Sequence, residues 1–288
     1  MVMVDFEDIK DRLEEIDEDV QTLVDRAAEE LRKVYEDHHT TVMYDFYQAK
    51  VKTPYYAQKY QREILRQAQE GLKAFVADFG RELESHIEDA VEQGVSDARA
   101  DLESLGYEVP QDSMEETKLE LVNDISDMAM AYVSTQADRM AQQMKSTLKQ
   151  QATAVMRRAR GSGKSMKDAA SDIEAEALKL EPKLQFIDRA GRRWDSKSYF
   201  DLVTRSTINN AVRESYTTAM IENGHDLVAI YSLQAVDRCL PHHGQIISLS
   251  GATEGYPTYD ELKASGDIFH PRCRCRLIGV NSKGGSES

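Results

Sequence analysis

The sequence predicts an α+β protein, with an elongated bundle of long helices followed by a small mixed α+β module. Apolar residues recur at helical spacing through the first 160 residues, whereas β-branched runs of strand length appear only after residue 184. The charge divides the chain in a similar way. Residues 1–150 carry 34 acidic and 17 basic side chains, and residues 151–288 carry 17 acidic and 19 basic. All three cysteines lie between residues 239 and 275, inside the predicted C-terminal module.

The first predicted helix carries a heptad repeat on an otherwise charged sequence. Apolar residues recur at seven-residue intervals, and a second set lies between them: Phe6, Leu13, Val20, Ala27 and Val34 with Ile9, Ile16 and Leu23. This narrow seam predicts a coiled coil or a helical hairpin over residues 6–34, whose partner can be another helix of the same chain. The acidic charge of this half indicates either a partner different from that of the C-terminal half or the solvated surface of long helices.

Two further long helices follow, and each presents one apolar face. We expect the first over residues 57–105, after a break at Pro54 and before Gly106 and Pro110. The second is predicted over residues 114–160, with several methionines on its packing face. Three long helices joined by short breaks predict an elongated bundle or stalk.

The most basic part of the chain spans residues 145–167, around the sequence GSGKS. One interpretation is a phosphate-contacting patch for nucleic acid. The other is a helix C-terminus that favours cations and leads into a solvated linker. GSGKS lacks the complete P-loop pattern, and no apolar strand leads into it. The candidate nucleic-acid contacts are Arg157, Arg158, Arg160, Lys164 and Lys167.

The C-terminal half alternates helix and strand patterns. Ser165 and Asp168 form a predicted capping box at the start of a short helix. Residues 184–195 predict a β-hairpin, after which Ser196 is expected to cap a helix that ends at Asn223-Gly224. The predicted strands lie within residues 226–233, 245–251 and 268–280.

These patterns predict four segments in chain order. They are an acidic long-helix or coiled-coil region, a basic linker with a short helix, the compact α+β module and a flexible tail. Their predicted boundaries are residues 1–160, 161–183, 184–280 and 281–288. The N-terminus is acidic where a signal peptide needs basic residues, and no run approaches the about 20 apolar residues of a membrane span. We therefore expect a protein made in the cytoplasm, without a membrane partner.

The cysteines and three histidines form two short clusters, DRCLPHHG at residues 237–244 and HPRCRC at residues 270–275. Thiolate and imidazole are ligands that zinc prefers, and the spacings within each cluster let neighbouring ligands reach one ion. We predict a structural zinc site that joins the two clusters, because metal binding energy then becomes folding energy. The candidate ligands are Cys239, His242, Cys273, Cys275 and His270, with His243 as a rival.

Three other interpretations of these clusters stay open. A disulfide can join Cys239 to Cys273 or to Cys275, and buried cysteines without any bond pack as small hydrophobic residues. The third interpretation is catalysis, through a nucleophilic Cys239 beside a histidine or through a metal-activated water with Asp237 as the base. The pattern of the zinc deaminases is missing from the sequence.

Several motifs follow one another through the C-terminal module: DRAGRRW (188–194), TRST (204–207), GHDLV (224–228), the turn at Cys239, SLSG (248–251) and HPRCRC (270–275). This ordered set resembles the tailed-phage minor capsid, or head morphogenesis, proteins of the phage Mu F-like and minor capsid protein 2 families. The long helices lie outside this resemblance. Mu F-like members often carry C-x-x-C where this chain has Cys239 and His242, and histidine can replace cysteine as a zinc ligand.

The resemblance implies a structural virion component that is present in few copies and associated with the portal. It implies a role in head assembly and in DNA packaging or ejection, with the portal protein, the capsid interior and phage DNA as partners and without enzymatic activity. We expect the protein in the head of a tailed phage or prophage, after assembly in the host cytoplasm. Two alternatives belong to other classes: a metal-dependent nuclease or hydrolase built on the Cys/His clusters, and a coiled-coil adaptor unrelated to phage.

Overall fold

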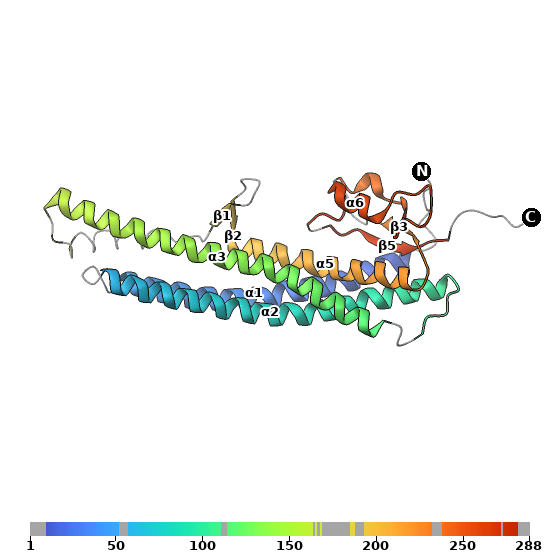
Figure 1. Cartoon of the computed structure of the whole chain (residues 1–288), viewed down its shortest axis with the longest axis horizontal. Coiled ribbons are helices and arrows are strands. Elements are labelled where there is room, and N and C mark those ends of the chain that lie inside the picture. The colour runs from blue at the N-terminus through green and yellow to red at the C-terminus, as the bar shows by residue number, and fades with distance from the viewer. Residues whose placement is uncertain are drawn as a thin grey trace, which may run out of the picture. The chain divides into compact units, whose positions relative to one another are not determined.

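Long helices make up most of the chain, and a small sheet forms near its C-terminal end (Figure 1). The computed structural model describes residues 10–51, 57–110, 114–163, 165, 168, 185–187, 193–231, 238–271 and 273–281. The α-helices among them are α1 (Lys10–Val51), α2 (Ala57–Ser104), α3 (Glu115–Ser162), α5 (Ser196–Glu222) and α6 (Tyr259–Ser265). The strands are β1 (Gln185–Ile187), β2 (Arg193–Asp195), β3 (Leu227–Tyr231), β4 (Ile246–Ser248) and β5 (Arg276–Gly279). The predicted α+β class is confirmed.

The contacts between residues divide the chain into two compact units, each assembled from separate stretches. The first unit comprises Met1–Glu29, Leu83–Ala129 and Leu202–Ser288. The second unit comprises Glu30–Glu82 and Met130–Asp201. The first unit therefore combines the C-terminal sheet with parts of α1, α2, α3 and α5. The segment boundaries at residues 160 and 183, which rest on composition, stay predictions.

Helices α2 and α3 begin and end within two residues of their predicted limits, and α1 extends beyond the predicted seam to Val51. The buried apolar residues of α1 include Leu13, Ile16, Val20, Val24, Ala27 and Leu31. Leu23 and Val34, which the heptad places in the seam, are only half-buried. A helix of 3.6 residues per turn drifts against a strict seven-residue repeat, so the buried face moves by one residue along α1. The first members of the repeat, Phe6 and Ile9, lie outside the described residues.

The three-stranded sheet of the first unit is antiparallel, with β3 between β4 and β5. All five residues of β3 are buried, because helices cover both faces of this strand. One face packs Val228 and Ile230 with residues of α2 and α5 such as Ala98 and Tyr216. The other face packs its alternate residues with Leu13 of α1.

Two helix ends follow the glycine pattern that the sequence predicts. After α2, Gly106 takes a φ of 90° and Tyr107 N donates to Leu102 O. After α5, Gly224 takes a φ of 77° and the next amide donates to Met220 O. Both arrangements satisfy carbonyls that the last helical turn leaves without partners. None of the helices in the described part of the chain is apolar over a bilayer-spanning length.

In the second unit, the predicted hairpin forms between β1 and β2, with Phe186 opposite Trp194. The start of α5 differs from the prediction. Asp195, and not Ser196, caps this helix, since its carboxylate accepts from Ser198 N at 2.9 Å. Ser196 is instead the first helical residue and is buried. A carboxylate at this position also faces the positive end of the helix dipole, which favours Asp195 as the cap.

The structure shows one of the two reciprocal hydrogen bonds of the capping box predicted at Ser165 and Asp168. Asp168 N donates to Ser165 Oγ at 3.2 Å, and Ser165 Oγ donates to the Asp168 carboxylate at 2.7 Å. The rest of the short helix predicted after this box lies outside the described residues.

Candidate metal centre

Three of the predicted metal ligands lie close together in the first unit. Cys239 Sγ is 3.0 Å from His270 Nε2 and 3.7 Å from Cys273 Sγ. One donor atom from each of these three residues lies within 4.8 Å of the donor atoms of the other two. Both cysteines are 3% exposed, and His270 is half-buried. The structure therefore brings together one ligand of the first sequence cluster and two of the second.

Two short turns place these side chains. Cys239 directly precedes the single-turn helix η2 (Leu240–His242), and His242 N donates to Cys239 O at 3.0 Å. In the second cluster, Cys273 N donates to His270 O at 2.8 Å and closes a four-residue turn. The H-x-x-C spacing thus becomes a turn whose first and last side chains both meet Cys239.

The turn at His270 begins from a strained backbone. Phe269 has a φ of 58°, which costs free energy in a residue other than glycine. Its ring lies 5.1 Å from the ring of Tyr259, and the Arg213 guanidinium lies 4.6 Å from its centroid. These contacts of the Phe269 ring offset the cost of the positive φ and fix the position of Phe269 before the turn.

A backbone carbonyl fixes the tautomer of His270. Nδ1 of His270 lies 3.0 Å from Pro271 O. A carbonyl oxygen only accepts hydrogen bonds, so Nδ1 carries the proton and the neutral ring keeps its lone pair on Nε2. Nε2 is the nitrogen that faces Cys239 Sγ. This is the arrangement in which histidine binds a metal ion, with the other ring nitrogen held by an acceptor.

The environment of Cys273 favours its thiolate form. Its pKa is lowered to about 5, first by a hydrogen bond from the Cys275 side chain. Burial opposes this shift, whereas the Cys275 amide, the charge of Arg213 and Cys239 add to it. Thiolate is the form that binds metals. All three cysteines are described and none forms a disulfide.

The remaining predicted ligands do not join the group of three. His242 Nδ1 lies 2.8 Å from Gln245 Oε1. The ring of His243 packs 5.3 Å from that of Tyr231. Cys275 is buried in the same apolar core as the other two cysteines, beside Cys273. Of the C-x-x-H pair, only the cysteine therefore faces the second cluster. Asp237, the base considered for a hydrolase, lies outside the described residues.

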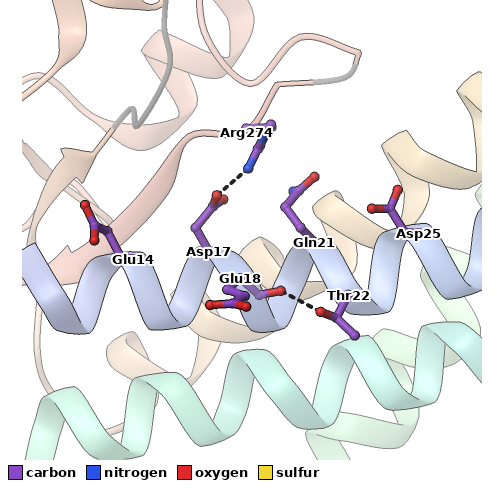
Figure 2. Close-up of a pocket in the computed structure, with 7 residues that line it drawn as sticks. All are labelled: Glu14, Asp17, Glu18, Gln21, Thr22, Asp25 and Arg274. Carbon is purple, nitrogen blue, oxygen red and sulfur yellow. Dashed lines mark hydrogen bonds and ion pairs between the residues drawn. The ribbon is translucent and has the colours of Figure 1, made fainter.

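Arg274 of the second cluster and Arg276, just after it, face α1. Arg274 reaches a pocket of about 290 Å³, where its side chain points toward Asp17 (Figure 2). The other lining residues all come from α1, and most of them are acidic. They are Glu14, Asp17, Glu18, Gln21, Thr22 and Asp25.

Asp17 forms ion pairs with both of these arginines. Its carboxylate lies 2.5 Å from Arg274 Nη2 and 2.9 Å from Arg276 Nη2. Asp17 and Arg276 are almost fully buried, and Arg276 also donates to Asn209 of α5. Burial lowers the pKa of Arg276, and the charge of Asp17 opposes that shift. Sequence reasoning missed Asp17, because it is one acidic residue among many and its partners lie more than 250 residues away.

The candidate nucleic-acid contacts are only partly described. Arg157 and Arg160 are exposed near the end of α3, three residues apart and so on neighbouring positions of the helix surface. Arg158 is half-buried. Lys164 and Lys167 lie outside the described residues.

Comparison with known proteins identifies the family. Residues 53–280 match the model of phage minor capsid protein 2. The chain belongs to the phage minor capsid protein 2 family. This assignment confirms the resemblance seen in the C-terminal motifs and gives the protein a structural role in a phage. No curated protein and no solved structure shows significant similarity to the chain.

The family match also corrects the expected extent of the resemblance. It begins at residue 53, so α2 and α3 belong to the minor capsid protein 2 region together with the sheet and the Cys/His clusters. The described part of α1 precedes the match, although Leu13 and Asp17 contact the C-terminal module. The motifs near the C-terminus are recognisable from their unusual residues. Long amphipathic helices have common patterns and carry no such signal.

Proposed function

We propose that this chain is a structural, non-enzymatic minor head protein that docks on the portal or the capsid interior. In this role it aids head assembly and DNA packaging or ejection, within a virion assembled in the host cytoplasm. The family match over residues 53–280 carries the proposal, because a minor capsid protein must contact other head proteins. The alternative, a metal-dependent nuclease or hydrolase, gains no support, since the converging thiols are buried in an apolar core.

The docking surface in this proposal is an exposed part of α3. The heptad seam of α1 is largely buried within the chain, so it is not available to a partner. Met128 and Tyr132, one turn apart on α3, are 58% and 59% exposed. Large apolar side chains of this kind are covered when a helix packs on a partner.

The proposed DNA contact is the basic end of α3. Arg157 and Arg160 are exposed there, and neighbouring Arg158 and the linker lysines add charge in the same stretch. Phosphate contacts need cations in reach of solvent but no particular pocket. The competing explanation is that Arg160 in the last turn of α3 stabilises the helix end.

Detection of the chain in purified proheads and in mature particles tests the structural role. We expect it in both, at a few copies per head, and cross-linked to the portal or to the inner capsid surface. Substituting Met128 and Tyr132 with serine should reduce its incorporation without unfolding it. Absence of the chain from both particle types contradicts the proposal.

The salt dependence of DNA binding tests the nucleic-acid contact. Neutralising Arg157, Arg158 and Arg160 to glutamine should lower the slope of log affinity against log salt by about 2 to 3, since each phosphate that a cation neutralises adds about 0.9 to that slope. The matched control neutralises three exposed cations of α2, Arg66, Lys73 and Arg81. An equal slope in the two variants rules out the basic end of α3 as the contact.

A further inference from the structure

The geometry points to a single zinc ion bound by Cys239, His270 and Cys273, with Cys275 as the fourth ligand. This inference does not depend on the proposed role in the phage head. It concerns the metal cross-link that joins the two clusters of the C-terminal module. It selects four ligands among the six cysteines and histidines of those clusters.

The separations of the donor atoms fit tetrahedral zinc. With Zn–S bonds of about 2.3 Å, two sulfur ligands lie about 3.8 Å apart. The Cys239 and Cys273 sulfurs are 3.7 Å apart, whereas a disulfide requires about 2.05 Å. Sulfur and nitrogen ligands of zinc lie about 3.6 Å apart, so the observed 3.0 Å between Cys239 Sγ and His270 Nε2 needs only a small side-chain rotation.

The histidine is already oriented for a metal. Pro271 O holds the proton on Nδ1 of His270, and Nε2 therefore presents its lone pair to the space beside Cys239. Zinc-binding histidines are oriented in this way by a carbonyl or carboxylate on the second nitrogen. His243, which packs on an aromatic ring, is not part of the group.

Cys275 supplies the fourth ligand in this inference, although its donor atom lies outside the group of three, so its side chain must turn toward Cys239 and His270 when the ion binds. A structural zinc site takes four protein ligands, and Cys275 interacts directly with the Cys273 side chain. All three cysteines lie in one apolar cluster with Ile268 and Leu277. Such a closed site excludes water, so the ion it holds serves structure and not catalysis.

A zinc ion here ties together parts of the module that are distant in sequence. Cys239 lies before β4, and the other ligands lie after α6, so the ion closes a loop of more than thirty residues. The elements described within that loop are short: the single-turn helix η2, a three-residue strand and a seven-residue helix. A metal cross-link therefore supplies folding free energy that such short elements cannot supply alone.

The test measures zinc in the purified full-length chain. We expect one zinc per chain after removal of excess metal by dialysis, and a thiolate-to-metal absorption band when cobalt replaces zinc. Cys239→Ser, Cys273→Ser and His270→Ala should each weaken zinc binding at least about 100-fold, more than removal of an outer hydrogen-bond partner does. His243→Ala is the matched control and should keep one zinc.

Three results overturn the inference. They are a folded wild-type chain that takes up no zinc, equal zinc binding by the Cys273→Ser variant, and a disulfide between Cys239 and Cys273 in the chain isolated from reducing cytoplasm. If a variant does not fold, titration of the wild-type thiols with a mercurial decides. Release of one zinc as the three thiols react supports the site, and reaction of the thiols without zinc release rejects it.

Discussion

Removal of the Asp17 carboxylate should destabilise the first unit strongly. In Asp17→Ala, Arg276 keeps its buried position, about 5% exposed, but loses its carboxylate partner. An uncompensated buried charge costs about 3–5 kcal/mol, whereas the pair with Arg274, which is 40% exposed, adds at most about 1 kcal/mol. We therefore expect the free energy of unfolding to fall by about 3–5 kcal/mol.

Urea unfolding, followed by circular dichroism, measures this decrease in stability. With an m-value near 3 kcal/mol/M, the midpoint should fall by about 1–2 M. Asp25→Ala is the matched control, because Asp25 lines the same pocket of α1 and pairs with Arg205 at 2.6 Å. Asp25 is 66% exposed, so its ion pair with Arg205 contributes at most about 1 kcal/mol. Both variants place alanine in α1, so the gain in helix propensity is the same in each and does not affect their difference.

A double variant separates the buried charge from other effects. Replacing Asp17 by leucine and Arg276 by methionine together removes both charges and keeps apolar volume, a change that is often nearly neutral. We expect the double variant to recover most of the stability that Asp17→Ala loses. Equal losses in Asp17→Ala and Asp25→Ala would refute the reasoning, and so would a double variant less stable than Asp17→Ala.

Three further predictions concern single residues of the first unit. Gly94→Ala should lower the free energy of unfolding by urea by about 1–3 kcal/mol, because the added Cβ would lie 2.2 Å from Val212 O. Gly161→Ala is the control and should be neutral or stabilising, because a Cβ at Gly161 would meet open space. Burial raises the pKa of Asp97 from 3.8 to about 6, so its ionisation costs stability as pH rises through this range. At neutral pH, the free energy of unfolding of Asp97→Asn should therefore exceed that of the wild type by at most about 3 kcal/mol. Below pH 3.8 the two proteins should be equally stable. Burial raises the pKa of Asp226, but the hydrogen bonds that its carboxylate accepts outweigh burial and lower that pKa. Asp226→Ala should therefore lower the free energy of unfolding by about 1–3 kcal/mol at neutral pH. The loss should become progressively smaller in acid, below the ordinary aspartate pKa of about 4.

The secondary structure is largely predictable, because local patterns decide it. The apolar periodicity locates α2 and α3, and glycine with positive φ marks the ends of α2 and α5. Helix α6 is missing from the prediction, since seven residues are too short to show an apolar period, although Thr258 and Glu261 form the capping box that starts it. The assembly of each unit is not predictable, since an amphipathic face does not say which other element covers it.

The ligand set shows the same limit at a smaller scale. Spacing alone makes C-x-x-H and H-x-x-C equally good half-sites, so the sequence cannot choose between His242 and His270. The choice depends on the direction of each turn, which carries His242 to Gln245 and His270 to Cys239. Backbone hydrogen bonds and the positive φ of Phe269 fix those directions, and neither appears as a spacing in the sequence.

The sequence from Cys273 to Ile278 connects the candidate metal centre to α1. Successive side chains of an extended chain point to opposite faces. Cys273, Cys275 and Leu277 face the core that holds Cys239, and the residues between them face α1, where Arg274 and Arg276 meet Asp17. A shift of this segment by one residue would turn the arginines toward the apolar core and the cysteines toward an acidic helix. The alternation of cysteine and arginine thus fixes the register of the segment from both sides. It also explains why α1 contacts a segment that lies more than 250 residues later in the chain.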